Sequence, residues 1–190
     1  MSKTPSEKEK KFILETKASL KSKDKKIVLS KLRELKTSGN ANILPYILDL
    51  LESSDSSEIV QEVLNLIRDL RDQQSVPIIV DFIQKNIKGI YIGEIVSSCW
   101  QSRLDFHAYL NIFATCFLHG DYQTSLEAFT VIEEMLWKSS NSQIESCKEI
   151  LVDNVSKVND EKKPLYRELI KVIDEGKSDN SDMYPDLYEK

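Results

Sequence analysis

The chain has 190 residues, of which 41% are hydrophobic and 30% charged, and its formal net charge at pH 7 is −5. This length and apolar content suit one soluble domain with a continuous core. No apolar run approaches the roughly 20 residues that a helix needs to cross a bilayer. The first residues are polar and lysine-rich, which argues against a secretory signal and makes the cytoplasm the expected location.

Glycine and proline are scarce, with five of each, while Leu, Ile, Lys and Glu are common. Such a composition predicts an all-α fold of long helices joined by short connections. The three cysteines, Cys99, Cys116 and Cys147, lie far apart on separate predicted helices and form no CxxC pair. We therefore expect buried free thiols, and neither a disulfide nor a zinc site.

The first predicted helix begins at the capping box Thr4-Pro5-Ser6-Glu7 and runs to about Ser22. Its narrow apolar stripe consists of Phe12, Ile13, Thr16 and Leu20. A mostly polar helix suits the end of a helical stack, so residues 1–23 are interpreted as a capping helix. Residues 1–36 contain twelve Lys and Arg against five Asp and Glu, a net +7 that leaves −12 for the rest. A basic end can contact nucleic acid, anionic lipid or an acidic partner, but Lys and Glu alternate in it as on a solvated helix face.

The stretch from Ile27 to Ile83 repeats itself at an offset of 32 without a gap. Ile27, Val28 and Leu32 fall on Ile59, Val60 and Leu64, and Pro45, Ile47 and Asp49 fall on Pro77, Ile79 and Asp81. Each copy holds two apolar-periodic stretches, the second with proline in its first turn, where the amide it lacks would have no helical partner. A period in the low thirties is typical of a stacked helical array. We expect helices between Asp24 and Gly39, from Asn42 to about Leu51, from Glu58 to about Arg71 and from Val76 to about Lys85.

Beyond Lys85 the repeat is less regular. The apolar loop Asn86–Gly93 is expected to tuck against the stack, and a helix containing Glu94 is expected to end near Arg103. Asp105 would cap the next helix, with His107 in the place of the proline and Asn111 in that of Asp49 and Asp81. Further helices are expected at Tyr122–Trp137, Asn141–Val158 and Glu161 to about Glu175.

The pattern as a whole predicts about ten helices, with residues 24–176 forming the repeat array. Residues 177–190 lack periodicity and are rich in Ser, Asp and Asn, which predicts an acidic flexible tail. The alternative for its segment Tyr184–Tyr188 is a short docking peptide.

Val63–Asp72 and Val76–Ile83 follow each other as a first helix, an aspartate-bearing turn, a proline and a second helix. This pattern resembles HEAT repeats, especially the short bacterial HEAT-like kind. The match is good over residues 24–86 and weak over 90–158, where the later units lack the proline. The resemblance implies a right-handed α-solenoid of HEAT- or armadillo-like helical pairs, an α-α superhelix whose second helices line a concave docking face.

On the helix that starts at Asn42, the outward positions are Tyr46, Asp49 and Glu52. Their successors are Ile78, Asp81 and Lys85, and then Ala108, Asn111 and Thr115. The candidate partner-binding residues are therefore Tyr46, Asp49, Glu52, Asp81, Lys85 and Asn111. Asp49, Asp81 and Asn111 would align as a ladder that binds a basic peptide or helix, the alternative being ordinary solvated surface.

No pattern in the sequence specifies a reaction. No carboxylate or cysteine follows His107 or His119 at the i+3 or i+4 spacing, and no glycine-rich phosphate loop, GxSxG or HExxH occurs. We therefore predict no catalytic residue, metal or cofactor. The expected function is a non-catalytic protein-interaction module or scaffold.

Two other functions stay open. Some HEAT-like arrays are DNA glycosylases that remove alkylated bases, and Trp100, Arg103, Asp105 and Trp137 supply the residue types that they use. The charge of −12 beyond residue 36 argues against a groove for nucleic acid, and we expect both tryptophans to fill the core. A self-associating structural protein would use the apolar loop Ile87–Ile92 as its contact.

Overall fold

The computed structural model describes the backbone of residues 6–38 and 41–183, and the side chains of residues 6–36 and 41–176. Within these ranges every regular element is helical, which confirms the all-α prediction. The ten α-helices of the described ranges are α1 (Glu7–Leu20), α2 (Lys25–Ser38), α3 (Leu44–Ser53), α4 (Ser57–Asp69), α5 (Val76–Lys85), α6 (Ile92–Gln101), α7 (Leu110–His119), α8 (Tyr122–Leu136), α9 (Asn141–Asp153) and α10 (Lys163–Met183). The described 3-10 turns are η1 (Ala41–Ile43), η2 (Gln73–Ser75), η3 (His107–Tyr109) and η4 (Val155–Lys157).

Polar side chains fix the starts of the first two helices. The Ser6 hydroxyl accepts a hydrogen bond from the Glu9 amide at 3.3 Å and caps α1, whereas Thr4 of the predicted capping box lies outside the described residues. Before α2, the Asp24 carboxylate accepts from the Lys26 amide at 2.9 Å. Both caps satisfy amides that have no partner within the helix.

A 3-10 turn precedes each of the helices α3, α5 and α7. The carboxylates of Asp72 and Asp105 each accept from the amide two residues further on, so an aspartate organises η2 and η3. Pro45 and Pro77 then lie in the first turns of α3 and α5, as predicted. Ser75, the residue before α5, makes no capping bond, and its hydroxyl is buried without a partner.

The register of the third unit differs from the prediction by four residues. The second helices begin at Leu44, Val76 and Leu110. Thr115 therefore occupies in α7 the position that Asp49 and Asp81 occupy in their helices, and Asn111 corresponds to the two prolines.

A longer connection contributes to this difference. Residues 102–106 separate α6 from η3, whereas only residues 70–72 separate α4 from η2. The two additional residues bring Leu104 and Phe106 into the core, where they are 2% and 0% exposed. His107 consequently begins the 3-10 turn and does not replace a helix-starting proline.

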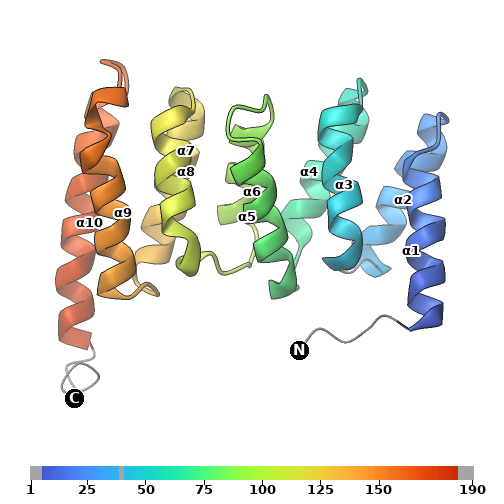
Figure 1. Ribbon diagram of the computed structural model, residues 1–190, viewed down its shortest axis with the longest axis horizontal. Helices are drawn as coiled ribbons and strands as arrows, with labels where there is room; N and C mark the ends of the chain where they lie inside the picture. The colour runs from blue at the N-terminus through green and yellow to red at the C-terminus, as the bar shows by residue number, and fades with distance from the viewer. Residues whose placement is uncertain (1–5, 39–40, 184–190) are drawn as a thin grey trace.

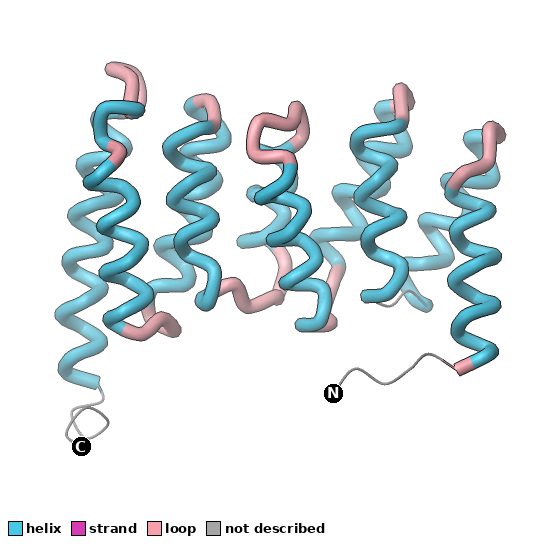
Figure 2. The backbone as a smooth tube through the Cα atoms, in the orientation of Figure 1, coloured by secondary structure: helices cyan, strands magenta, loops and turns pink. Residues whose placement is uncertain are grey.

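The helices lie in two rows (Figures 1 and 2). The odd-numbered helices contact one another in chain order and form the odd row, which lies toward the viewer in Figure 1, and the even-numbered helices form the even row behind it. Neighbours in the even row pack closely, whereas α3, α5 and α7 meet over fewer residues. The odd row consequently leaves room for surface hollows between its helices.

Side-chain bonds link successive turns along one edge of the two rows. The Asp105 amide donates to the Gln73 side-chain oxygen at 3.1 Å, joining the turn before α7 to the turn before α5. The Ser139 hydroxyl donates to the His107 carbonyl at 3.4 Å, joining the α8–α9 connection to η3. We call this the linked edge.

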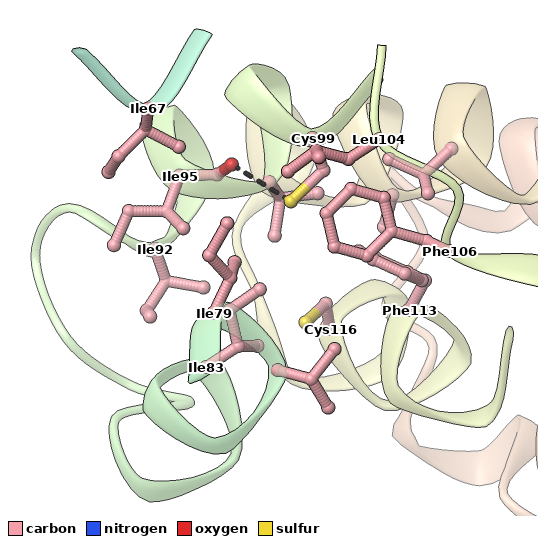
Figure 3. Close-up of a cluster of buried hydrophobic side chains, with 14 of the residues drawn as sticks. Ile67, Ile79, Ile83, Ile92, Ile95, Cys99, Leu104, Phe106, Phe113 and Cys116 are labelled. Atoms are coloured by element: carbon pink, nitrogen blue, oxygen red, sulfur yellow. Dashed lines mark hydrogen bonds between the residues drawn. The ribbon is translucent and has the colours of Figure 1, made fainter. Parts of the chain in front are cut away.

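Buried side chains from both rows form one continuous core. Figure 3 shows part of it, where Ile79 and Ile83 of α5 meet Ile95 and Cys99 of α6 and Phe113 and Cys116 of α7. The three cysteines are buried and free, as predicted. Burial raises the pKa of the Cys116 and Cys147 thiols to about 12, so both are protonated at neutral pH.

The expectation that both tryptophans fill the core is wrong. Trp100 is 39% exposed and Trp137 is 66% exposed. The Trp100 indole lies at the surface because its N–H donates to the Glu127 carboxylate of α8 at 2.7 Å. Trp137 directly follows the last residue of α8, in the connection to α9, where its ring projects from the core.

Two further expectations are corrected. The loop after α5 is not fully tucked against the core, because Ile90 at its tip is 84% exposed. The last helix does not end near Glu175 but continues to Met183, since an established helix extends through residues of modest propensity at little further cost. The segment Tyr184–Tyr188 lies outside the described residues.

Candidate interaction face

The outward side of α3 carries three of the six candidate residues. Tyr46 is half-buried, and Asp49 and Glu52 are exposed. Steps of three residues turn gradually around a helix. Tyr46 and Asp49 therefore border a hollow on the side of α1, while Glu52 borders a second hollow on the side of α5.

The first hollow has a volume of about 460 Å³ and lies between α1 and α3. Its apolar lining comes from Leu20, Val28, Leu50 and Ile59, and its polar border from Lys17, Lys21, Ser22, Asp49, Ser53 and Ser54. The Lys17 ammonium lies 4.7 Å from the centre of the Tyr46 ring, a cation–π contact between α1 and α3. The hollow thus combines an apolar floor with a basic wall on α1 and an acidic wall on α3.

The second hollow has a volume of about 270 Å³ and lies between α3, α5 and the start of α6. Its lining is mostly apolar and consists of Leu51, Glu52, Phe82, Asn86, Gly89, Ile90, Tyr91, Ile92 and Ile95. The loop that forms its rim is held by hydrogen bonds. The Asn86 side chain donates to the Phe82 carbonyl at 3.1 Å, and the Gly89 amide donates to the Asn86 carbonyl at 2.7 Å.

Gly89 lies where this loop turns closely on itself. A Cβ atom at Gly89 would lie 3.0 Å from the Asn86 carbonyl oxygen, tighter than ordinary packing allows. The tight turn presents Ile90 to solvent directly beside the second hollow.

The other three candidate residues have partners within the chain. Asp81 and Lys85 form an exposed i,i+4 ion pair at 2.6 Å on α5. The Asn111 amide donates to the Ser146 hydroxyl of α9 at 3.0 Å, so it joins two helices of the odd row. Together with the shifted register, these bonds show that Asp49, Asp81 and Asn111 do not form a single ladder.

The basic first part of the chain meets acidic residues of α4 in the even row. Lys25 pairs with Glu58 at 2.7 Å and Lys36 with Glu62 at 3.2 Å, and Arg33 lies 3.8 Å from Glu58. The hydrogen bond from Lys25 lowers the pKa of the Glu58 carboxyl. Part of the basic charge is therefore neutralised within the chain, a pairing that the alternation of Lys and Glu along the sequence does not reveal.

The residues of the glycosylase alternative are divided between two places. Asp105 lies on the linked edge, where one carboxylate oxygen bonds the His107 ring at 2.9 Å and the other lies 3.5 Å from Lys138, the residue after Trp137. Burial opposes ionisation of Asp105, but the bonds from His107 outweigh it and lower the pKa. Trp100 is instead bound to Glu127 of α8.

A buried lysine that no motif in the sequence singles out joins the start of α10 to α7. Lys162 is 3% exposed, and its ammonium donates to the carbonyls of Phe117, Leu118 and Gly120 at 2.9, 3.1 and 3.0 Å. These carbonyls lie at the end of α7, where helical partners are missing and the helix dipole favours a cation. Desolvation lowers the pKa of Lys162, and the nearby carboxylates of Asp121 and Glu161 oppose this shift.

No family model, curated protein or solved structure matches the chain. The resemblance to HEAT repeats therefore stays a prediction from the residues. Among the described residues, no group of three or more His, Cys, Asp and Glu side chains is arranged to hold a metal ion. In the same ranges, none of the helices combines the length and apolarity needed to span a membrane.

Proposed function

We propose that the chain is a non-catalytic protein-interaction module, a HEAT-like α-solenoid that binds a segment of a partner protein across the outward side of α3. The arrangement of the helices in two rows supports the solenoid, because repeat arrays of this kind stack helical pairs so that each contacts its neighbours. The odd row contains the second helices of the pairs, which the resemblance assigns to docking.

One observation carries the proposal: two apolar hollows with charged borders flank the same helix. Apolar side chains that enter pockets supply most of the affinity of protein interfaces, and charges around them select the partner. Asp49 borders the first hollow and Glu52 the second, and neither forms an ion pair with another described residue. A partner segment that fits this surface has two apolar side chains, one for each hollow, and a Lys or Arg between them.

Selection of random peptides displayed on phage against the wild-type chain tests this function. The expected consensus combines apolar anchors with basic residues. For a selected peptide, Asp49→Lys should weaken binding about tenfold or more, because it places like charges in contact.

The matched control is Glu133→Lys, which makes the same charge change at an exposed position of α8 in the even row. It should leave the dissociation constant unchanged. An acidic consensus, the absence of any enriched peptide, or equal losses in the two variants would contradict the proposed binding face.

A further inference from the structure

The patch around Ile90 carries an inference that goes beyond the proposed partner site. Ile90 is 84% exposed, more than any other large hydrophobic side chain among the described residues. It projects from a loop that is fixed at its base by the bonds of Asn86 and Gly89. The second hollow opens directly beside it, lined chiefly by Leu51, Phe82, Tyr91 and Ile95. A protruding apolar side chain and an apolar hollow thus lie together on one surface.

Such a surface is complementary to itself. In a two-fold contact the same patch is used on both copies, so a protrusion on each copy can enter the hollow of the other. We propose that, when no partner segment is bound, the occupant of the second hollow is Ile90 of a second copy of this chain, and that the chain forms a symmetric dimer through the Ile90 patch, defined as Ile90, the second hollow, Glu52 and Lys88. The second apolar anchor of the partner segment and Ile90 of the other copy then compete for the same hollow.

One charge in the lining of the second hollow and one in the loop that carries Ile90 support the same arrangement. Glu52 lines the hollow and Lys88 precedes Ile90 by two residues in the loop; both are exposed. Neither has an ion-pair partner among the described residues. A two-fold rotation that exchanges the Ile90 side chains brings Glu52 of each copy toward Lys88 of the other, so that each unpaired charge meets its opposite.

Sedimentation velocity of the full chain over a range of concentrations tests the proposal. The wild type should shift from monomer to dimer as concentration rises, with a dissociation constant in the micromolar range expected for a small interface. Ile90→Asp should weaken the dimer at least about tenfold, because it places a carboxylate in an apolar hollow. Ile90 contacts little of its own chain, so circular dichroism and the urea midpoint should stay unchanged.

Leu14→Asp is the matched control. Leu14 of α1 is also an exposed large aliphatic side chain, at 68%, but it lies outside the Ile90 patch, so this variant should dimerise like the wild type. Asp49→Lys should likewise leave the dimer intact, which separates this proposal from the partner site at the first hollow.

Exchanging the charges of Glu52 and Lys88 tests whether these two residues pair across the two-fold axis. Glu52→Lys and Lys88→Glu should each weaken the dimer several-fold, and the double variant should regain most of the wild-type affinity because the pair is restored with reversed signs. A wild type that is monomeric up to about 500 μM, far above the micromolar range, would overturn the proposal. A dimer that survives Ile90→Asp, or a double variant weaker than either single one, would also overturn it.

Discussion

Lys162 shows how much a single side chain can contribute when it is buried. Its ammonium is the shared donor for three carbonyls at the end of α7. We predict that Lys162→Met, which keeps the apolar stem, lowers the free energy of unfolding by about 2–3 kcal/mol, because carbonyls shielded from water lose a charged donor. Urea unfolding of the two proteins measures this loss.

The neighbouring Lys163 provides the comparison. It pairs with Asp160 at 2.6 Å, but both side chains are largely exposed. Lys163→Met should therefore change the free energy of unfolding by no more than about 0.5 kcal/mol. Similar losses of unfolding free energy in the two variants would show that the bonds of Lys162 to α7 stabilise the fold no more than the exposed pair of Lys163 and Asp160.

His119 links stability to pH. Desolvation, followed by the nearby charges of Lys157, Lys88 and Lys162, lowers its pKa from 6.5 in the folded chain. Between the lowered pKa and 6.5 the unfolded chain binds more protons than the folded chain, so the free energy of unfolding rises with pH through this window. Below the window the destabilisation caused by His119 has reached its full size.

The expected result is that the wild type loses more stability than His119→Gln when pH falls from about 7 to about 5, since only the wild type takes up this proton. Urea unfolding at a series of pH values gives both curves. Parallel curves would mean that His119 titrates alike in the folded and unfolded chain.

At the scale of the helix, α5 carries a buried and an exposed side chain within one turn. Ile79 is 0% exposed, whereas Asp81 lies on the outward side with Lys85. We predict that Ile79→Ala costs about 3 kcal/mol of unfolding free energy, because it leaves a cavity, and that Asp81→Ala changes it by no more than about 0.5 kcal/mol. Equal losses in urea unfolding would contradict the orientation of α5.

The helices themselves were predictable wherever local signals agreed. Helix α5 has the predicted bounds. Three local signals mark them: the apolar periodicity, Pro77 in the first turn and the glycine-containing loop that follows Lys85. In the third unit no proline marks the first turn, and the start of the second helix was expected four residues too early, with His107 where the structure has Asn111. The extra length of the 102–106 connection is visible only when the burial of Leu104 and Phe106 is known.

The candidate site was predictable only in part, for a related reason. Helical phase correctly places Tyr46, Asp49 and Glu52 on the outward side of α3, because this phase is a local property. The bond from Asn111 to Ser146 and those of Lys162 to α7 join residues 35 or more positions apart. No periodicity within a single helix encodes such contacts.

For the whole molecule we expect protection against hydrogen exchange to be greatest in the middle of the array. Helices α6, α7 and α8 pack closely and contribute fully buried Ile95, Phe113 and Val131, respectively. In contrast, α1 buries only Thr16 and Leu20. Because local opening requires fewer contacts to break at an end, the amides of α1 should exchange fastest among the long helices.

Hydrogen exchange followed by mass spectrometry resolves these segments. Equal protection in α1 and α7 would indicate that the chain opens only as one cooperative unit. A gradient from the middle toward the ends would instead show that each helical pair is stabilised mainly by its neighbours.

The linked edge also has a mechanical consequence. The bonds from Asp105 to Gln73 and from Ser139 to His107 hold successive turns at fixed separations. The hollows beside α3 are rimmed at the opposite edge, by the ends of α1, α3 and α5. Neither bond joins α1 to α3 or α3 to α5. We therefore expect the two hollows to change width more readily than the spacing of the linked turns, which lets the hollows admit side chains of different size.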